Sequence, residues 1–71
     1  MDELSVAMGE NIRRIRKANG MSLKRVAEEI GATPEQMCRW EQGFCCPSAF
    51  YLIRISKAFG CYIEELYEGV T

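Results

Sequence analysis

The sequence contains no histidine, only two prolines and no glycine-rich run. Histidine is the side chain that most often exchanges protons near neutral pH, and glycine-rich loops are typical of nucleotide phosphate sites. The carboxylates show no pairing that would set two of them opposite each other in a cleft. We therefore expect no enzyme, no cofactor and no small-molecule substrate.

Long hydrophobic runs are also missing. No stretch approaches the roughly 20 apolar residues that cross a bilayer, and the first residues lack the basic-then-apolar pattern of a secretory signal. These absences predict a cytoplasmic protein without membrane contact. The 71 residues are enough for one small domain, spanning residues 1–71, with a marginal core. Association into a homodimer would add stability.

The chain has four cysteines but no C-x2-C pair: Cys38, Cys45, Cys46 and Cys61. Zinc sites usually use such pairs, often with histidine, so we expect no structural metal. Cysteines of a cytosolic protein stay reduced, which predicts mostly apolar packing for them. A thiol-based or soft-metal switch at Cys45 and Cys46 remains an alternative.

Charge is nearly balanced overall but unevenly distributed. The net charge of -1 and the pI near 5.4 disfavour a protein that holds nucleic acid by bulk positive charge. Residues 11–27 nevertheless contain six basic and no acidic side chains: Arg13, Arg14, Arg16, Lys17, Lys24 and Arg25. Acidic residues cluster instead near the other end, at positions 64, 65 and 68. This pattern predicts a local positive face, or simply the solvated side of a helix.

Residues 22–41 have the pattern of two short helices joined by a tight turn. Val26, Ala27 and Ile30 recur at helical spacing, and Ser22 supplies a capping oxygen, so a helix is predicted at about 23–30. Gly31 follows as its stop, where a positive φ is easily adopted by glycine.

Thr33 is the capping residue that precedes the second of these helices. A threonine cap, Pro34 at the first helical position and Gln36 completing a capping box predict a helix over 34–42. Met37 and Trp40 point to the same side, so Trp40 is interpreted as part of the core rather than as a base-stacking surface.

Three more helices complete the pattern, at about 4–18, 48–59 and 63–67. Because strand propensity is almost absent between them, the predicted fold is an all-α, compact five-helix bundle.

The stretch from Gly9 to Tyr67 resembles the phage Cro/repressor-type helix-turn-helix domain, also called the XRE family. Its lambda-repressor-like fold would place the helix at 34–42 in the major groove of DNA. The residues that carry the resemblance are Ile12, Ile15, Arg16, Ser22, Val26, Ala27, Gly31, Thr33, Met37, Arg39, Trp40, Glu41, Gly43, Pro47, Ser48, Leu52, Ser56, Phe59, Gly60, Ile63 and Leu66.

The resemblance implies which residues face base edges: Pro34, Glu35, Gln36 and Arg39. Arg39 would bond a guanine, and Gln36 an adenine or a phosphate. Glu35 would accept from a cytosine amine, or serve only as an acid favoured by the helix dipole. Phosphate contacts are expected from a second set: Arg13, Ser22, Lys24, Arg25, Gln42 and Phe44.

Two further assignments come from the resemblance. Arg16 and Glu41 are expected to form a structural ion pair beneath the two short helices. The C-terminal stretch is expected to form a dimer interface through Phe59, Cys61, Tyr62 and Tyr67. The implied function is a sequence-specific regulator of transcription that binds double-stranded DNA, located in the bacterial or phage nucleoid and acting as a repressor dimer.

Departures from the family pattern concern phosphate binding. Leu23 stands where many members have a glutamine that bonds a phosphate, and the 44–46 loop carries no positive charge where many members have lysine or arginine. An alternative is an antitoxin-like or other protein-interaction module with weak DNA binding. Its exposed anchors for a protein partner would be Phe44, Tyr51, Tyr62 or Tyr67.

Overall fold

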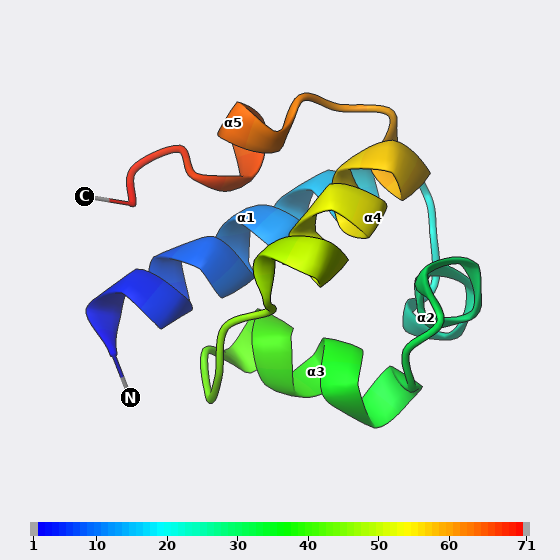
Figure 1. Cartoon of the computed structure of the whole chain (residues 1–71), viewed down its shortest axis with the longest axis horizontal. Helices are drawn as coiled ribbons and strands as arrows, with labels where there is room; N and C mark the ends of the chain where they lie inside the picture. The colour runs from blue at the N-terminus through cyan, green and yellow to red at the C-terminus, as the bar shows by residue number, and fades with distance from the viewer. Residues whose placement is uncertain (1, 71) are drawn as a thin grey trace.

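The computed structural model describes residues 2–70 and contains five helices joined by short loops (Figure 1). They are α1 (Glu3–Ala18), α2 (Leu23–Ile30), α3 (Pro34–Gln42), α4 (Ala49–Phe59) and α5 (Ile63–Leu66). No strand occurs in this range, so the all-α prediction is confirmed. Within residues 2–70, none of these helices combines the length and the apolar content needed to cross a membrane.

The helix ends follow the capping residues. Ser22 accepts the backbone N–H of Arg25, and Thr33 and Gln36 form the predicted capping box. Gly31 and Gly43 end α2 and α3 with φ of 76° and 83°, a conformation that side chains other than glycine adopt at a cost. The approximate predicted bounds differ by one residue at three ends: α1 begins at residue 3, residue 48 only caps α4, and α5 ends at residue 66.

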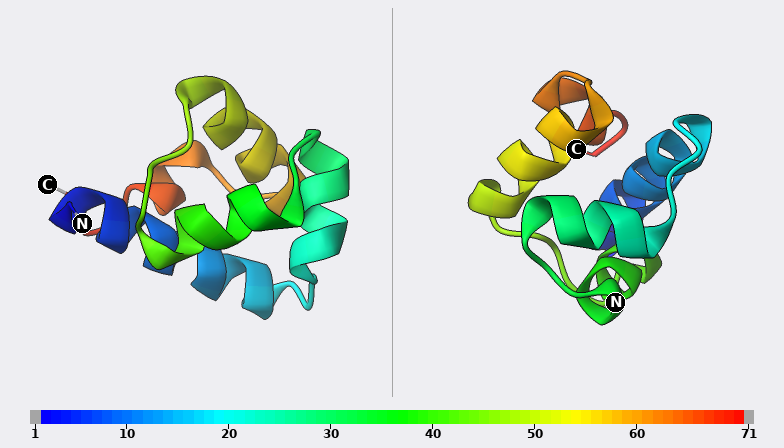
Figure 2. Two further views of the ribbon diagram at one scale, coloured as in Figure 1. Left: turned by 90° about the horizontal axis from the view of Figure 1, so that it is seen from below. Right: turned by 90° about the vertical axis from the view of Figure 1, so that its right-hand side faces the viewer.

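Helix α1 forms the base against which α3 and α5 pack, while α2 contacts α3 and α4. In Figure 1, α3 lies along the lower edge, α2 is seen end-on, α4 crosses the middle of the view and α5 lies at the upper edge; Figure 2 shows the same arrangement from two other sides. The buried apolar side chains between these helices form one cluster: Met8, Ile12, Met21, Val26, Ala27, Ile30, Met37, Trp40, Leu52, Ile55, Phe59 and Leu66.

The crossing of α1 and α3 is unusually close at Gly9. A Cβ added there would lie 2.3 Å from the carbonyl oxygen of Trp40 and 2.7 Å from that of Glu41. Real Cβ atoms essentially never show such distances. The absence of a side chain at this position therefore lets the two helix backbones meet.

Asn11 connects α1 to the C-terminal segment. Its Nδ2 donates to the carbonyl oxygens of Leu66 and Glu68 at 2.9 and 2.7 Å, and its Oδ1 accepts from Arg14 at 3.2 Å. A buried amide with several hydrogen bonds stabilises only one arrangement of its partners. This residue thus holds α5 and the chain after it against α1.

Candidate nucleic-acid interface

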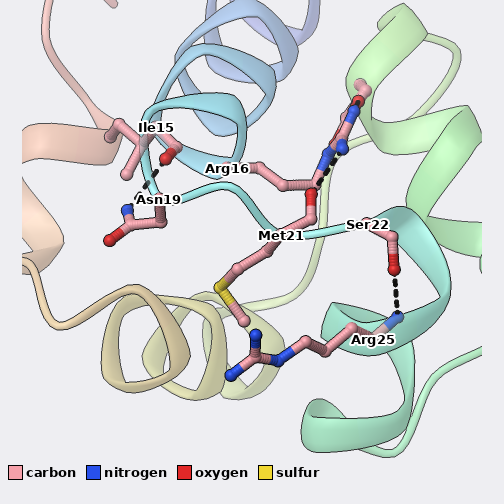
Figure 3. A network of polar contacts seen from close by, with 7 residues as sticks. Ile15, Arg16, Asn19, Met21, Ser22 and Arg25 are labelled. Atoms are coloured by element: carbon pink, nitrogen blue, oxygen red, sulfur yellow. Dashed lines mark hydrogen bonds and ion pairs between the residues drawn. The ribbon is translucent and has the colours of Figure 1, made fainter.

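A buried ion pair joins α1 to α3 beneath the two short helices. Arg16 Nε donates to Glu41 Oε2 at 2.6 Å and Arg16 Nη2 to Oε1 at 3.1 Å, while Nη1 donates to the carbonyl oxygen of Met21 at 2.8 Å (Figure 3). Only 11% of the Arg16 side chain and 6% of the Glu41 side chain are exposed. Such a two-pronged contact fixes both orientation and distance. The predicted structural ion pair is confirmed.

Helix α3 has one buried and one open side. Met37 and Trp40 are buried, and the Trp40 ring lies 5.1 Å from the ring of Tyr51. The interpretation of Trp40 as a core residue is confirmed. The four residues predicted to face base edges are all exposed: Pro34, Glu35, Gln36 and Arg39.

Gln36 has a constraint that the resemblance did not reveal. Its Oε1 accepts the backbone N–H of Thr33 at 3.0 Å as part of the capping box. Bonding adenine at both N6 and N7 requires the glutamine oxygen as an acceptor. While the cap is intact, one lone pair of the Gln36 oxygen is occupied, and both hydrogens of its amide nitrogen stay available for donation.

The first turn of α2 presents three exposed polar residues, Ser22, Lys24 and Arg25. The Ser22 oxygen accepts from the Arg25 N–H at 3.1 Å, which leaves its hydroxyl hydrogen available (Figure 3). Arg25 Nε lies 3.7 Å from an oxygen of Glu29, a weak exposed pair that partly offsets its charge. Lys24 forms no ion pair with any described residue.

A pocket of about 190 Å³ opens between α1, α2 and α3. Arg13 and Gln42, both predicted to contact phosphate, line it together. Leu23 and Cys38 supply less polar walls, and the Arg16–Glu41 pair completes the lining. The structure therefore brings two of the predicted phosphate residues to one site. Cys38 was expected only to pack against apolar side chains, and the structure places it in the wall of this pocket.

The loop from Gly43 to Ser48 departs from expectation. Phe44 is one of the expected phosphate contacts, but it has no polar side-chain atom, and its N–H donates to the carbonyl oxygen of Arg39 at 3.1 Å and so ends α3. That part of the prediction is wrong, because the helix end uses the donor. The Phe44 ring is 63% exposed.

The cysteines do not all pack as predicted. Cys45 and Cys46 are exposed, whereas Cys38 and Cys61 are half-buried, and all four are free thiols. Apolar packing was thus the wrong expectation for the two adjacent cysteines, because a short loop leaves them no helix face to cover. Among residues 2–70, no group of three or more histidine, cysteine, aspartate or glutamate side chains is placed to hold a metal ion.

One expected dimer contact is also wrong. Phe59 is only 5% exposed because it belongs to the core, so it offers no surface to a partner. Tyr62 and Tyr67 are 78% and 43% exposed, and Cys61 is half-buried. Burial and the nearby Glu65 carboxylate raise the pKa of the Cys61 thiol.

Two apolar residues on the outer side of α4, Phe50 and Ile53, were missed by the sequence reasoning. They are 53% and 48% exposed, and Arg54 lies over the Phe50 ring at 4.2 Å. Arg54 also donates to the carbonyl oxygen of Ile30 at 2.9 Å, which links α4 to the end of α2. The sequence does contain a signal for this surface. Phe50 and Ile53 are three residues apart, and this spacing puts them together on a helix face other than the buried face of α4.

The sequence and the structure were both compared with known proteins. The sequence matches the family HTH_3, described as helix-turn-helix, over residues 12–66. No curated protein sequence matches it.

Solved structures of similar fold include three named proteins. The restriction-modification controller protein C.AhdI from Aeromonas hydrophila is 24% identical, with a TM-score of 0.85, over 89% of this chain and 96% of that one. The clp gene regulator ClgR from Corynebacterium glutamicum is 25% identical, with a TM-score of 0.87, over 92% of this chain and 69% of that one. The P22 c2 repressor protein, solved in complex with a synthetic operator, is 29% identical, with a TM-score of 0.81, over 87% of this chain and 94% of that one.

Proposed function

We propose that this chain, which belongs to the helix-turn-helix family HTH_3, is a cytoplasmic regulator of transcription that binds double-stranded DNA in a sequence-specific way. The observation that carries the proposal is the arrangement of α3. Its inner side is buried and held by the Arg16–Glu41 pair, while its outer side presents four exposed residues to a partner.

The outer side of α3 would enter the major groove. Arg39 can donate two hydrogen bonds to O6 and N7 of a guanine, worth about 1–3 kcal/mol of discrimination. Gln36 would add its amide nitrogen as a donor to an acceptor on a base or phosphate, since its oxygen already accepts the Thr33 N–H. Glu35 would accept from a cytosine amine, and the Pro34 ring would contact a thymine methyl group.

Phosphate binding would come from two groups of residues. The first turn of α2 offers Ser22, Lys24 and Arg25, and the pocket between α1 and α3 offers Arg13 and Gln42. These contacts fix position on the duplex but do not distinguish sequences. With a net charge of -1, affinity would depend on this local cluster rather than on the whole molecule.

We further propose a repressor that acts as a homodimer on two half-sites with centres about 34 Å apart. Tyr62, Tyr67 and Cys61 remain the candidate contacts between copies, with Phe59 removed from the set. Doubling the number of phosphate and base contacts would compensate for the uncharged 44–46 loop. Sedimentation at several protein concentrations tests this part independently of DNA.

A second candidate function is a protein-interaction module that keeps the fold but binds DNA weakly. The observation that favours it is the number of exposed apolar side chains outside the α3 surface, at Phe44, Phe50, Ile53 and Tyr62. Phe50 and Ile53 lie three residues apart on one side of α4, and adjoining exposed apolar side chains mark contact surfaces more often than scattered single residues do.

A binding titration against genomic DNA fragments at rising salt separates the two functions. If the protein is a DNA-binding regulator, the logarithm of its affinity should fall steeply and linearly with the logarithm of the salt concentration. This function also predicts that Arg39→Ala weakens preference at one base pair, whereas Lys24→Ala weakens all sequences alike. Lys57→Ala on α4 is the matched charge control and should leave DNA affinity unchanged. Absent or salt-insensitive binding would favour the protein-interaction module.

A further inference from the structure

Cys45 and Cys46 form a pair of exposed thiols in the loop that joins α3 to α4. As neighbours in the chain, their Cα atoms are about 3.8 Å apart. Both lie outside the helices, so their side chains are free of helical packing. Neither residue takes part in the proposed contacts to base edges or phosphates.

The spacing favours one kind of thiol chemistry over another. Disulfides usually join Cα atoms roughly 4.4–6.8 Å apart, so adjacent residues form a disulfide only under strain. A single larger atom placed between the two sulfurs bridges the pair without a direct S–S bond. A trivalent, pyramidal centre suits this geometry, because it binds two sulfurs on the same side at close to a right angle.

The electrostatic surroundings of the two thiols also favour a ligand that binds both sulfurs. Partial burial raises the pKa of the Cys46 thiol, and the neighbouring Cys45 thiolate and the Asp2 carboxylate raise it further. Two thiolates in this loop would repel each other. A ligand that reacts with the two neutral thiols and leaves the complex neutral avoids that repulsion.

The remaining thiols lie in different surroundings. Cys38 lines the pocket between α1, α2 and α3, and Cys61 lies after α4, where Glu65 influences its pKa. Because no set of three or more metal-binding side chains occurs among the described residues, a cation that needs four protein ligands finds no site here. A ligand for the loop must therefore be one that needs only two sulfur atoms from the protein.

We propose that Cys45 and Cys46 form a dithiol site for mono-substituted trivalent arsenicals. In the reaction, R–As(OH)₂ and two thiols give R–As(S–Cys)₂ and two molecules of water. Two As–S bonds form, two As–O and two S–H bonds break, and each thiol proton leaves with a hydroxide as water. No oxidant or reductant is needed, and the arsenic keeps its organic substituent at the third position.

The test uses the reduced full chain, phenylarsine oxide as the probe, and both intact mass and native thiol titration as readouts. We expect one arsenical per chain and the loss of two of the four free thiols. A dithiol such as 2,3-dimercaptopropanol should release the adduct, whereas the same concentration of thiol supplied as 2-mercaptoethanol should not.

Single substitutions locate the site. Cys45→Ser and Cys46→Ser should each raise the half-saturating arsenical concentration roughly 100-fold or more, because the second bond is then no longer intramolecular. Cys38→Ser and Cys61→Ser are the matched controls and should bind like the parent chain. Circular dichroism confirms that each variant is folded, and Cys46→Ala provides a second variant at the same position. A folded parent chain without the adduct, an adduct that persists in both loop variants, or its loss in a control variant would overturn the proposal.

Discussion

The α1–α3 crossing and the loop after α3 lie next to each other but differ in almost every physical respect. At the crossing, Gly9 lets two backbones meet, and Arg16 and Glu41 are buried with their polar atoms paired. In the loop, Phe44, Cys45 and Cys46 are exposed and carry no positive charge. The comparison teaches that the scaffold which holds α3 is intact, whereas the loop is free to differ from the family pattern without loss of fold.

The largest expected effect is at the crossing. Glu41→Ala leaves the Arg16 guanidinium buried without its carboxylate, which should lower the free energy of unfolding by about 3–5 kcal/mol. Urea denaturation followed by circular dichroism measures it. Glu29→Ala, which removes the acid of an exposed pair, is the control and should cost no more than about 0.5 kcal/mol. Similar costs for the two variants would contradict the contrast between buried and exposed pairs.

The next effect concerns Gly9. Gly9→Ala forces the α1 backbone away from the Trp40 and Glu41 carbonyl oxygens, so we expect a loss of about 1–3 kcal/mol of stability. Glu10→Ala changes the next residue, which is exposed, and should stay within about 0.5 kcal/mol of the parent. Thermal unfolding of both variants checks the prediction, and an unchanged melting temperature for Gly9→Ala would show that the crossing tolerates a methyl group.

A smaller effect is expected at the start of α3. Thr33→Ala removes the oxygen that accepts the Gln36 N–H at 3.2 Å, which should cost about 1 kcal/mol. Ser48→Ala at the start of α4 removes a longer contact of 3.5 Å and should cost less. Chemical denaturation of the two variants side by side decides the order; a greater loss for Ser48→Ala would reverse our ranking of the caps.

The smallest effect is expected in the loop. Phe44→Ser replaces a ring that is 63% exposed and keeps the backbone N–H that bonds the Arg39 carbonyl, so stability should change by less than about 0.5 kcal/mol. Denaturant unfolding measures this change. A loss comparable with that of Gly9→Ala would mean that the loop supports the fold, and the comparison between the two regions would fail.

Much of the local structure was readable from the sequence. The capping residues and glycines predicted the ends of α2 and α3, and the buried sides of these two helices followed from helical spacing. The Arg16–Glu41 pair came only from the resemblance to a family, because 25 positions separate its members. Gln36 illustrates the limit: the sequence suggested both a cap and a base-contacting role, and the geometry confirms only the cap, in which its oxygen accepts the Thr33 N–H.

The sequence by itself determined the five helices and the family, because caps, turns and helical periodicity depend on residues within a few positions of one another. Tertiary structure decided the backbone contact at Gly9, the hydrogen bonds of Asn11 to the C-terminal segment and the exposure of the adjacent cysteines. The reason is physical: each of these features depends on how distant helices cross, and the crossing is set by the packing of the whole core.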